Sequence, residues 1–289
     1  MRFFPRRALS SLMATTIPIA LTIAGSDSSG GAGIQADLKT FSAFGVYGAS
    51  VITALTAQNT QGVDAVHRVP ADFIQAQLNA VCSDLDVAAV KIGMTGTADA
   101  VRAIAEALPE ATESPVVLDP VMVAESGASL LEEDAVSALR EKLFPLADLV
   151  TPNLPEAAKL LGTPVARGEM EIRAQARSLH EMGPRAVLVK GGHGEGSEAV
   201  DILFDGTRYL RLVMPRVDTI NAHGTGCTLS SAITACLAHG VAQRDAVFRA
   251  KAYITDALKH ADALQVGQGP GPVHHFHALW RLAGESDAE

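Results

Sequence analysis

The sequence predicts a three-layer α/β/α fold with a mostly parallel central sheet and an antiparallel edge. Short apolar runs that are typical of buried strands alternate with helical patterns along most of the chain. Apolar residues make up 48% of the chain and aromatic residues only 4%, which favours an aliphatic parallel sheet over an aromatic-rich β-sandwich. The loops of most unusual composition follow predicted strands, and ligands bind beyond strand ends in such sheets.

Strands and helices follow one another in turn. Strands are predicted at Ile19–Ala24, Gly48–Thr53, Val87–Ile92, Val116–Asp119, Leu149–Thr151 and Ala186–Lys190. Helices are predicted at Gln35–Phe44, Pro70–Cys82, Ala98–Leu108, Leu131–Leu143, Pro155–Leu161, Glu169–Met182, Gly226–Ala238 and Arg244–Leu264. The segment Ala199–Val213, with a turn at Asp205 and Gly206, is typical of an antiparallel hairpin. This order implies right-handed crossovers and a mostly parallel sheet.

We expect one folded domain over residues 17–284, with a short tail at 285–289, because no long linker interrupts the alternation. Residues 1–16 are basic and weakly apolar, and Ser10 and Ser11 break their apolar stretch. We expect a disordered extension there, or an upstream start codon with Met13 as the true first residue. Export or organelle targeting is the alternative.

Charge and cysteine content argue against several classes of partner. The chain holds 23 Lys and Arg against 32 Asp and Glu, a formal charge of −9, and it lacks a basic stripe that would favour nucleic acid. Three widely spaced cysteines are too few for a disulfide framework and predict reduced thiols in the cytoplasm. No apolar run reaches the roughly 18 residues needed to cross a bilayer, so no membrane partner is expected.

The strongest motif opens the helix predicted at Gly226–Ala238. It reads Asn221-Ala222-His223-Gly224-Thr225-Gly226-Cys227-Thr228. Its glycines let the backbone approach a ligand closely, and the N–H groups of a helix N-terminus attract an anion such as phosphate. The same position lowers the pKa of a thiol, so Cys227 is expected to accept a proton as a thiolate. The alternative is an ordinary Gly-rich start to a core helix with a buried cysteine.

A second Gly-rich loop, Gly25–Gly33, follows the first predicted strand. It lacks the Gly-Lys-Ser/Thr of a P-loop and the glycine spacing of a dinucleotide site, so it indicates only that the backbone approaches some ligand. The helix after it carries Asp37 in its first turn. Asp37 is either a ligand-binding carboxylate or one that is stabilised by the helix dipole.

Three more strand ends carry charged or amide side chains. Asn153 and Glu156 match a capping box, although Glu156 is also suited to holding Mg²⁺ through water. Lys190 lies beside three glycines and would neutralise phosphate, unless it is simply solvated in a hairpin turn. Asp119 ends another strand and either caps a turn or helps to organise water around the metal.

Together these segments resemble the hydroxymethylpyrimidine/phosphomethylpyrimidine kinases of thiamine biosynthesis, within the ribokinase-like superfamily. Eight blocks match in order across nearly the whole chain: Ala24–Asp37, Thr56–Thr60, Lys91–Met94, Val117–Met122, Thr151–Ala157, Lys190–His193, His223–Thr228 and Gly271–Phe276. One Gly-rich loop would be weak support, whereas eight ordered blocks are highly specific. Ala222 departs from the pattern, since many relatives carry threonine there.

The resemblance implies ATP with Mg²⁺, usually a homodimer, and two successive reactions. The hydroxymethyl group of 4-amino-5-hydroxymethyl-2-methylpyrimidine is phosphorylated first, and the monophosphate is then phosphorylated to the diphosphate. By position, the pyrimidine pocket would be lined by Gly25, Asp37, Gln58, Met94 and Val121. The magnesium and phosphate region would use Asn153, Glu156 and Lys190. The anion hole and the base would be Gly224, Thr225, Gly226 and Cys227.

Other functions on this scaffold stay open. A pyridoxal or pyridoxine kinase is the nearest, because those substrates are also flat heteroaromatic hydroxymethyl compounds. A sugar kinase is disfavoured, because Cys227 stands where sugar kinases use aspartate. A catalytically silent ligand-binding relative belongs to a different class, and the complete set of phosphate, metal and base positions argues against it.

Overall fold

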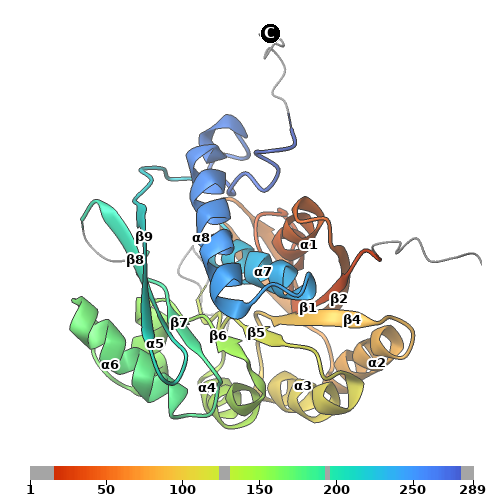
Figure 1. The fold of residues 1–289 in the computed structure, drawn as a ribbon. Helices are drawn as coiled ribbons and strands as arrows, with labels where there is room; N and C mark the ends of the chain where they lie inside the picture. The colour runs from red at the N-terminus through yellow and green to blue at the C-terminus, as the bar shows by residue number, and fades with distance from the viewer. Residues whose placement is uncertain (1–15, 124–130, 193–195, 281–289) are drawn as a thin grey trace, which may run out of the picture.

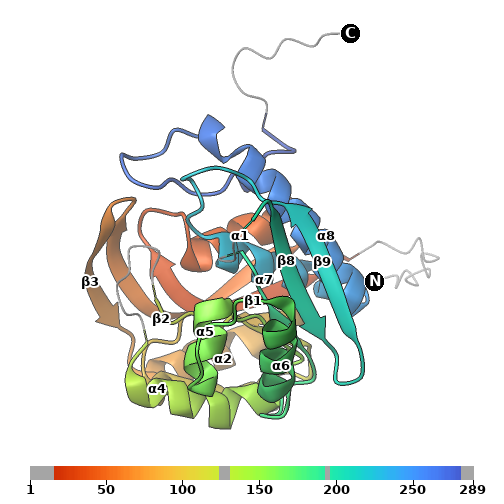
Figure 2. The ribbon, with the colours of Figure 1, turned by 90° about the vertical axis from the view of Figure 1, so that its left-hand side faces the viewer.

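The computed structural model describes residues 16–123, 131–192 and 196–280. They contain a nine-stranded sheet of order β3-β2-β1-β4-β5-β6-β7-β8-β9 (Figure 1). The neighbours in the central run β2-β1-β4-β5-β6-β7 pair in parallel. Antiparallel pairing adds β3 at one edge and the β8–β9 hairpin at the other (Figure 2). The strands are β1 Ile19–Asp27, β2 Tyr47–Asn59, β3 Gly62–Arg68, β4 Val87–Ile92, β5 Val116–Leu118, β6 Leu149–Val150, β7 Val187–Val189, β8 Glu198–Phe204 and β9 Tyr209–Pro215.

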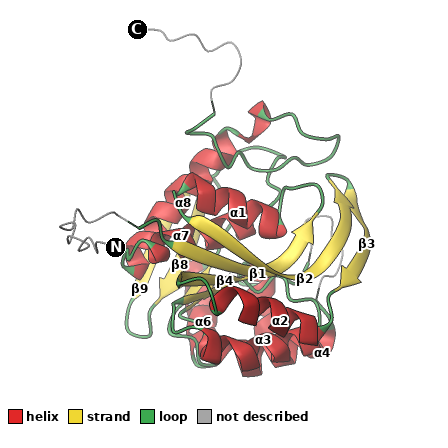
Figure 3. Ribbon diagram, turned by 90° about the vertical axis from the view of Figure 1, so that its right-hand side faces the viewer, coloured by secondary structure: helices red, strands yellow, loops and turns green. Residues whose placement is uncertain are grey.

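Helices cover both faces of the sheet, so the predicted fold class is confirmed. In Figures 1 and 3, α1, α7 and α8 lie on one face, and α2 to α6 lie on the other. The α-helices are α1 Gly33–Ala43, α2 Ala71–Cys82, α3 Ala98–Ala111, α4 Glu133–Ala138, α5 Leu154–Leu161, α6 Glu169–His180, α7 Thr225–Ala238 and α8 Gln243–Lys259. Shorter turns are the π-helical Leu139–Leu143 and the 3₁₀ turns Phe144–Leu146 and Ala261–Ala263.

The apolar runs of the central strands fill a core on each side of the sheet. Leu21 and Ile23 of β1 have no exposed surface and pack with residues of α2 to α6. Val117 and Leu149, from neighbouring strands, pack instead against α7 and α8. Because both faces of a parallel sheet are buried, its strands are continuously apolar, which is why the sequence revealed them.

The exposed edge differs most from the sequence prediction. β2 continues six residues past the predicted end at Thr53, to Asn59, and β3 has no counterpart among the predicted strands. Most of β3 is exposed, so it buries no apolar face that would give an alternating pattern. The segment predicted as one helix at 131–143 divides into α4 and the π-helical turn, and α8 ends at Lys259 rather than Leu264.

The parallel strands deliver their loops to one side of the sheet. β1 ends at Asp27, while Asp119 and Lys190 directly follow β5 and β7. Residues far apart in sequence therefore meet where the carboxyl ends of the strands converge. Among the described helices, none combines the length and apolar character needed to cross a membrane.

Candidate active site

A cavity of about 790 Å³ opens at the carboxyl ends of the strands. It is lined by every residue predicted for the site except Asp37: Gly25, Gln58, Met94, Asp119, Val121, Asn153, Glu156, Lys190, Gly224, Thr225, Gly226 and Cys227. The same cavity continues past Lys190 to an apolar end beside α8, where Ile254 and Leu258 line it. It can hold a small ring at one end and a larger ligand at the other.

The N-terminus of α7 forms the middle of this cavity. Gly224 caps the helix with φ of 81°, and a Cβ there would lie 1.9 Å from the Gly31 carbonyl oxygen, so only glycine fits. Gly226 lies so close to Lys190 that an added Cβ would be 3.2 Å from Nζ. First-turn N–H groups of a helix have no intrahelical acceptor, and here Gly226 and Cys227 of that turn line the cavity beside a lysine. The arrangement suits an anion.

Cys227 lies on this first turn, as predicted, but its predicted acidity is wrong. Burial raises the pKa of the Cys227 thiol to about 11, although the positive charge of Lys91 and a backbone hydrogen bond from Gly33 oppose the increase. Desolvation of the thiolate therefore outweighs the favourable potential of the helix N-terminus. At neutral pH Cys227 is mainly a thiol.

A buried ion pair lies near Cys227. Lys190 Nζ donates to Asp119 Oδ1 at 2.8 Å, and Thr151 Oγ1 lies 3.2 Å from the same oxygen. Asp119 is 1% exposed and Lys190 still reaches the cavity. The negative charge of Asp119 raises the pKa of Lys190, in opposition to burial. Lys190 is therefore a cation at neutral pH.

Asn153 and Glu156 form the predicted capping box at the start of α5. Asn153 Oδ1 accepts from Glu156 N–H at 2.8 Å, and Glu156 Oε2 accepts from Asn153 N–H at 2.7 Å. Burial raises the pKa of Glu156 to about 7; Lys190 opposes the shift and Asp119 adds to it. A cation near these two carboxylates would relieve their repulsion, so the donor set fits Mg²⁺ held largely through water. The described residues contain no cluster of three or more His, Cys, Asp or Glu that would bind a metal without such help.

Asp37 is the predicted pocket residue that the structure places elsewhere. It is fully buried behind Cys227, and Lys91 Nζ donates to both carboxylate oxygens at 3.0 and 2.8 Å. Thr22 and Ser231 each donate to it at 2.6 Å. With its acceptors occupied and no exposed surface, Asp37 does not line the cavity, which corrects the expectation that it contacts the pyrimidine.

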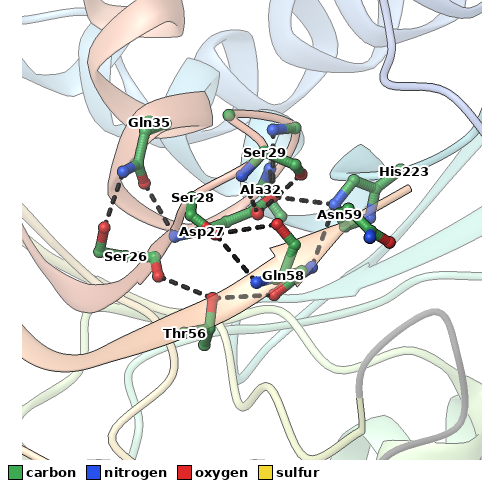
Figure 4. A network of polar contacts seen from close by, with 12 residues as sticks. Ser26, Asp27, Ser28, Ser29, Ala32, Gln35, Thr56, Gln58, Asn59 and His223 are labelled. Carbon is green, nitrogen blue, oxygen red and sulfur yellow. Dashed lines mark hydrogen bonds and ion pairs between the residues drawn. The ribbon is translucent and has the colours of Figure 1, made fainter. Parts of the chain in front are cut away.

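The last residue of β1 supplies a carboxylate that the sequence prediction missed. Asp27 lines the cavity, and its oxygens accept from the backbone N–H groups of Ser29, Gly31 and Ala32 (Figure 4). His223 Nε2 lies 3.0 Å from Asp27 Oδ2 and 3.4 Å from Gln58 Nε2. An aspartate after a strand, inside a Gly/Ser loop, was the available signal, but only the fold brings His223 to it.

The far end of the cavity contains a second pair that sequence reasoning did not single out. Lys251 of α8 lies 2.7 Å from Asp201 Oδ2, and Asp201 Oδ1 accepts from Gly191 N–H at 2.8 Å. These contacts tie α8 and β8 to the segment that carries Lys190. They fix the end of the cavity where Ile254 and Leu258 form an apolar wall.

Comparison with known proteins gives a consistent family match. The family model described as phosphomethylpyrimidine kinase matches residues 27–274. A hydroxymethylpyrimidine/phosphomethylpyrimidine kinase of Rhizobium meliloti is 59% identical over 263 residues, covering 91% of this chain and 98% of that protein. The crystal structure of phosphomethylpyrimidine kinase from Clostridium difficile has a TM-score of 0.74 at 46% identity, covering 84% of this chain and 100% of the other. An ADP complex of Bacillus subtilis pyridoxal kinase has a TM-score of 0.83 at 38% identity, covering 91% and 99%.

Proposed function

The chain belongs to the phosphomethylpyrimidine kinase family, and from this premise we propose that it phosphorylates 4-amino-5-hydroxymethyl-2-methylpyrimidine with ATP, first to the monophosphate and then to the diphosphate. One observation carries the proposal. The anion-binding turn Gly224–Gly226 lies in the same cavity as Gln58 and Met94 on one side and Lys190 on the other. An alcohol and a nucleoside triphosphate can therefore meet at the N-terminus of α7.

The ring end of the cavity has few polar groups among apolar ones. Met94 and Val121 would contact the faces of the ring, and Gln58 would pair with its polar edge. The opposite end beside α8 would hold the nucleoside, with Lys190 near the phosphates. Phosphoryl transfer depends mainly on such positioning and on charge stabilisation.

The metal, when bound, supplies positive charge for the phosphates, and Glu156 and Asp119 would hold it through water. N–H groups of the α7 first turn would stabilise the charge on the transferring phosphoryl group. The thiolate form of Cys227 would take the hydroxyl proton as the oxygen–phosphorus bond forms and ADP leaves. Because the thiol form predominates, this step would quicken as the pH rises toward about 11.

A pyridoxal kinase activity is the second candidate, favoured by the fold match to a pyridoxal kinase of similar length. An ADP-release assay with hydroxymethylpyrimidine, its monophosphate, pyridoxal, pyridoxine and ribose separates the possibilities. We expect the highest kcat/KM with hydroxymethylpyrimidine and turnover of its monophosphate. A preference for pyridoxal would replace the proposed substrate, and failure with all five would favour a silent ligand-binding relative.

We also propose that the protein acts as a cytoplasmic homodimer. The family resemblance supports this, as do exposed apolar residues on the β2–β3 edge, where Leu55 and Val66 are 46% and 43% exposed. Sedimentation equilibrium of the full chain tests it. A monomer at micromolar concentration would contradict the proposal.

A further inference from the structure

The contacts of Asp27 fix its charge and the position of a proton on its neighbour His223. Four donors converge on the carboxylate: the N–H groups of Ser29, Gly31 and Ala32, and the Ser29 hydroxyl. A carboxylate that accepts several hydrogen bonds is ionised, and the lowering of the Asp27 pKa to about 2 agrees, because hydrogen bonds from His223 and Ser29 outweigh burial. Asp27 is therefore an acceptor only.

His223 must then carry a proton on Nε2. That nitrogen lies 3.0 Å from Asp27 Oδ2, and two acceptors do not face each other at this distance without a proton between them. The same Nε2 lies 3.4 Å from Gln58 Nε2. An amide NH₂ facing a protonated ring nitrogen is a donor–donor contact. An amide oxygen at the same place would accept a second, longer hydrogen bond from the proton on His223 Nε2.

The other end of the Gln58 amide leads independently to the same orientation. Thr56 Oγ1 lies 2.9 Å from the Ser26 carbonyl oxygen, which can only accept, so the single hydroxyl proton is committed to Ser26 (Figure 4). Thr56 Oγ1 also lies 3.1 Å from Gln58 Oε1. The hydroxyl can then only accept from Gln58, which requires the amide nitrogen at this end.

We propose that Asp27, His223 and Thr56 are positioning residues that hold the Gln58 amide with its oxygen toward His223 and its nitrogen toward Thr56. In the structure Gln58 Nε2 faces His223 and Oε1 faces Thr56, so the proposed orientation is turned by 180°. The two ends of an amide have nearly the same shape. The inference rests on the proposed function and deepens it. One N–H and one lone pair of the amide stay available, in a fixed order, to the ring in the cavity.

A fixed donor–acceptor order selects one ring chemistry and one ring direction. An aminopyrimidine presents an amino donor beside a ring nitrogen acceptor, which pairs with the amide oxygen and N–H respectively. A reversed amide would match the same ring only after the ring turns over, and that would carry the hydroxymethyl group away from Cys227. By holding the Gln58 amide, Asp27, His223 and Thr56 thus set both the recognition of the ring and the direction of attack.

The test compares two substrates that differ by the amino group alone: hydroxymethylpyrimidine and 5-hydroxymethyl-2-methylpyrimidine. In the wild type we expect loss of the amino group to lower kcat/KM by about 5- to 100-fold, as for one hydrogen bond in a desolvated pocket. In His223→Leu and Thr56→Val this preference should shrink to about threefold or less. The matched control His239→Leu, at the other end of α7, should keep the wild-type preference.

A second measurement does not depend on turnover. Long-range ¹H–¹⁵N NMR of the full chain should show a proton on Nε2 of His223, assigned by its loss in His223→Leu. A bare Nε2, or losses in the two variants that are equal for both substrates, would overturn the inference. A wild type that phosphorylates both rings equally would also overturn it, whereas a wild type that phosphorylates neither would refute the proposed function instead.

Discussion

Two lysine–aspartate pairs with the same 2.8 Å contact have opposite relations to the cavity. Lys91 and Asp37 are both fully buried, and hydroxyls of Thr22 and Ser231 occupy the rest of the carboxylate. Lys190 retains 12% exposure at the cavity edge, where Asp119 has Glu156 as a charged neighbour. A lysine–aspartate contact of the same length therefore serves structure in one place and is open to a ligand in the other.

The difference follows from how completely each carboxylate is satisfied. Asp37 joins α1 to β1, β4 and α7, so it fixes the elements that carry the Gly-rich loop and the turn Gly224–Gly226. The cluster around Asp119 combines two carboxylates with one lysine, and this unbalanced negative charge suits a cation. A structural ion pair is distinguished from a functional one by its exposure to the cavity and by how many of the carboxylate's acceptor sites are occupied, more than by the ion pair itself.

Removing Lys91 from the fully buried Lys91–Asp37 pair should have the largest effect. Lys91→Met leaves the Asp37 charge buried without a counterion, so we expect the free energy of unfolding to fall by about 3–5 kcal/mol. Urea denaturation followed by circular dichroism measures it. The double variant Lys91→Met/Asp37→Leu, which removes both charges, should recover much of the loss. A Lys91→Met protein as stable as the wild type would remove the contrast between the pairs.

Cys227 lies within the electrostatic influence of both pairs and should control the rate. Cys227→Ala should lower kcat for hydroxymethylpyrimidine by about 10²–10⁴-fold, as for loss of a general base. The wild-type kcat should rise with pH toward about 11, and this rise should vanish in the variant. The second phosphorylation should suffer less, since a phosphate monoester is already ionised at neutral pH.

Cys236→Ala is the matched control, because Cys236 lies on the same helix, 2% exposed and away from the cavity. Its kcat should stay near that of the wild type. If Cys227→Ala matched Cys236→Ala in turnover, Cys227 would be a packing residue and the proton would leave by another route.

Removing Lys190 from the Lys190–Asp119 pair at the cavity edge should impair activity more than folding. Lys190→Met deletes a cation beside the turn Gly224–Gly226, so we expect kcat/KM for ATP to fall by about 10²-fold, as for loss of one preorganised hydrogen-bond donor. Steady-state kinetics with varied ATP measure the fall. Lys190→Arg keeps the charge and should recover part of the activity. A Lys190→Met variant that lost stability as severely as Lys91→Met would show that both pairs are structural.

Glu156 should give the smallest effect, visible as a pH dependence. Its folded pKa of about 7 lies above the ordinary 4.5, so its contribution to stability is full below about pH 4.5 and is lost as pH rises through about 7. Over the same range kcat/KM for MgATP should rise, because the ionised carboxylate attracts the metal. Glu156→Gln should flatten both profiles, while Glu110→Gln, at an exposed site on α3, should leave them unchanged.

The sequence predicted the fold where burial leaves a pattern. Continuous apolar runs identified the central strands, and capping residues such as Asn153 and Glu156 identified the start of α5, because both signals are local. β3 escaped detection because it is an exposed edge strand, and the division of 131–143 into an α-helix and a π turn has no clear local signal.

The sequence by itself determined the family, the α/β architecture and the glycines, carboxylates, amides, lysine and cysteine that it placed in the cavity, Asp37 excepted, since these follow from ordered motifs at strand ends. Only the tertiary structure decided the charge state and the hydrogen-bond partners of these side chains. It buried Asp37 against Lys91, brought Asp27 to His223, and desolvated Cys227 enough to raise the pKa that a helix N-terminus alone would lower. Charge state and hydrogen-bond partners depend on neighbours distant in sequence, and local pattern does not encode those neighbours.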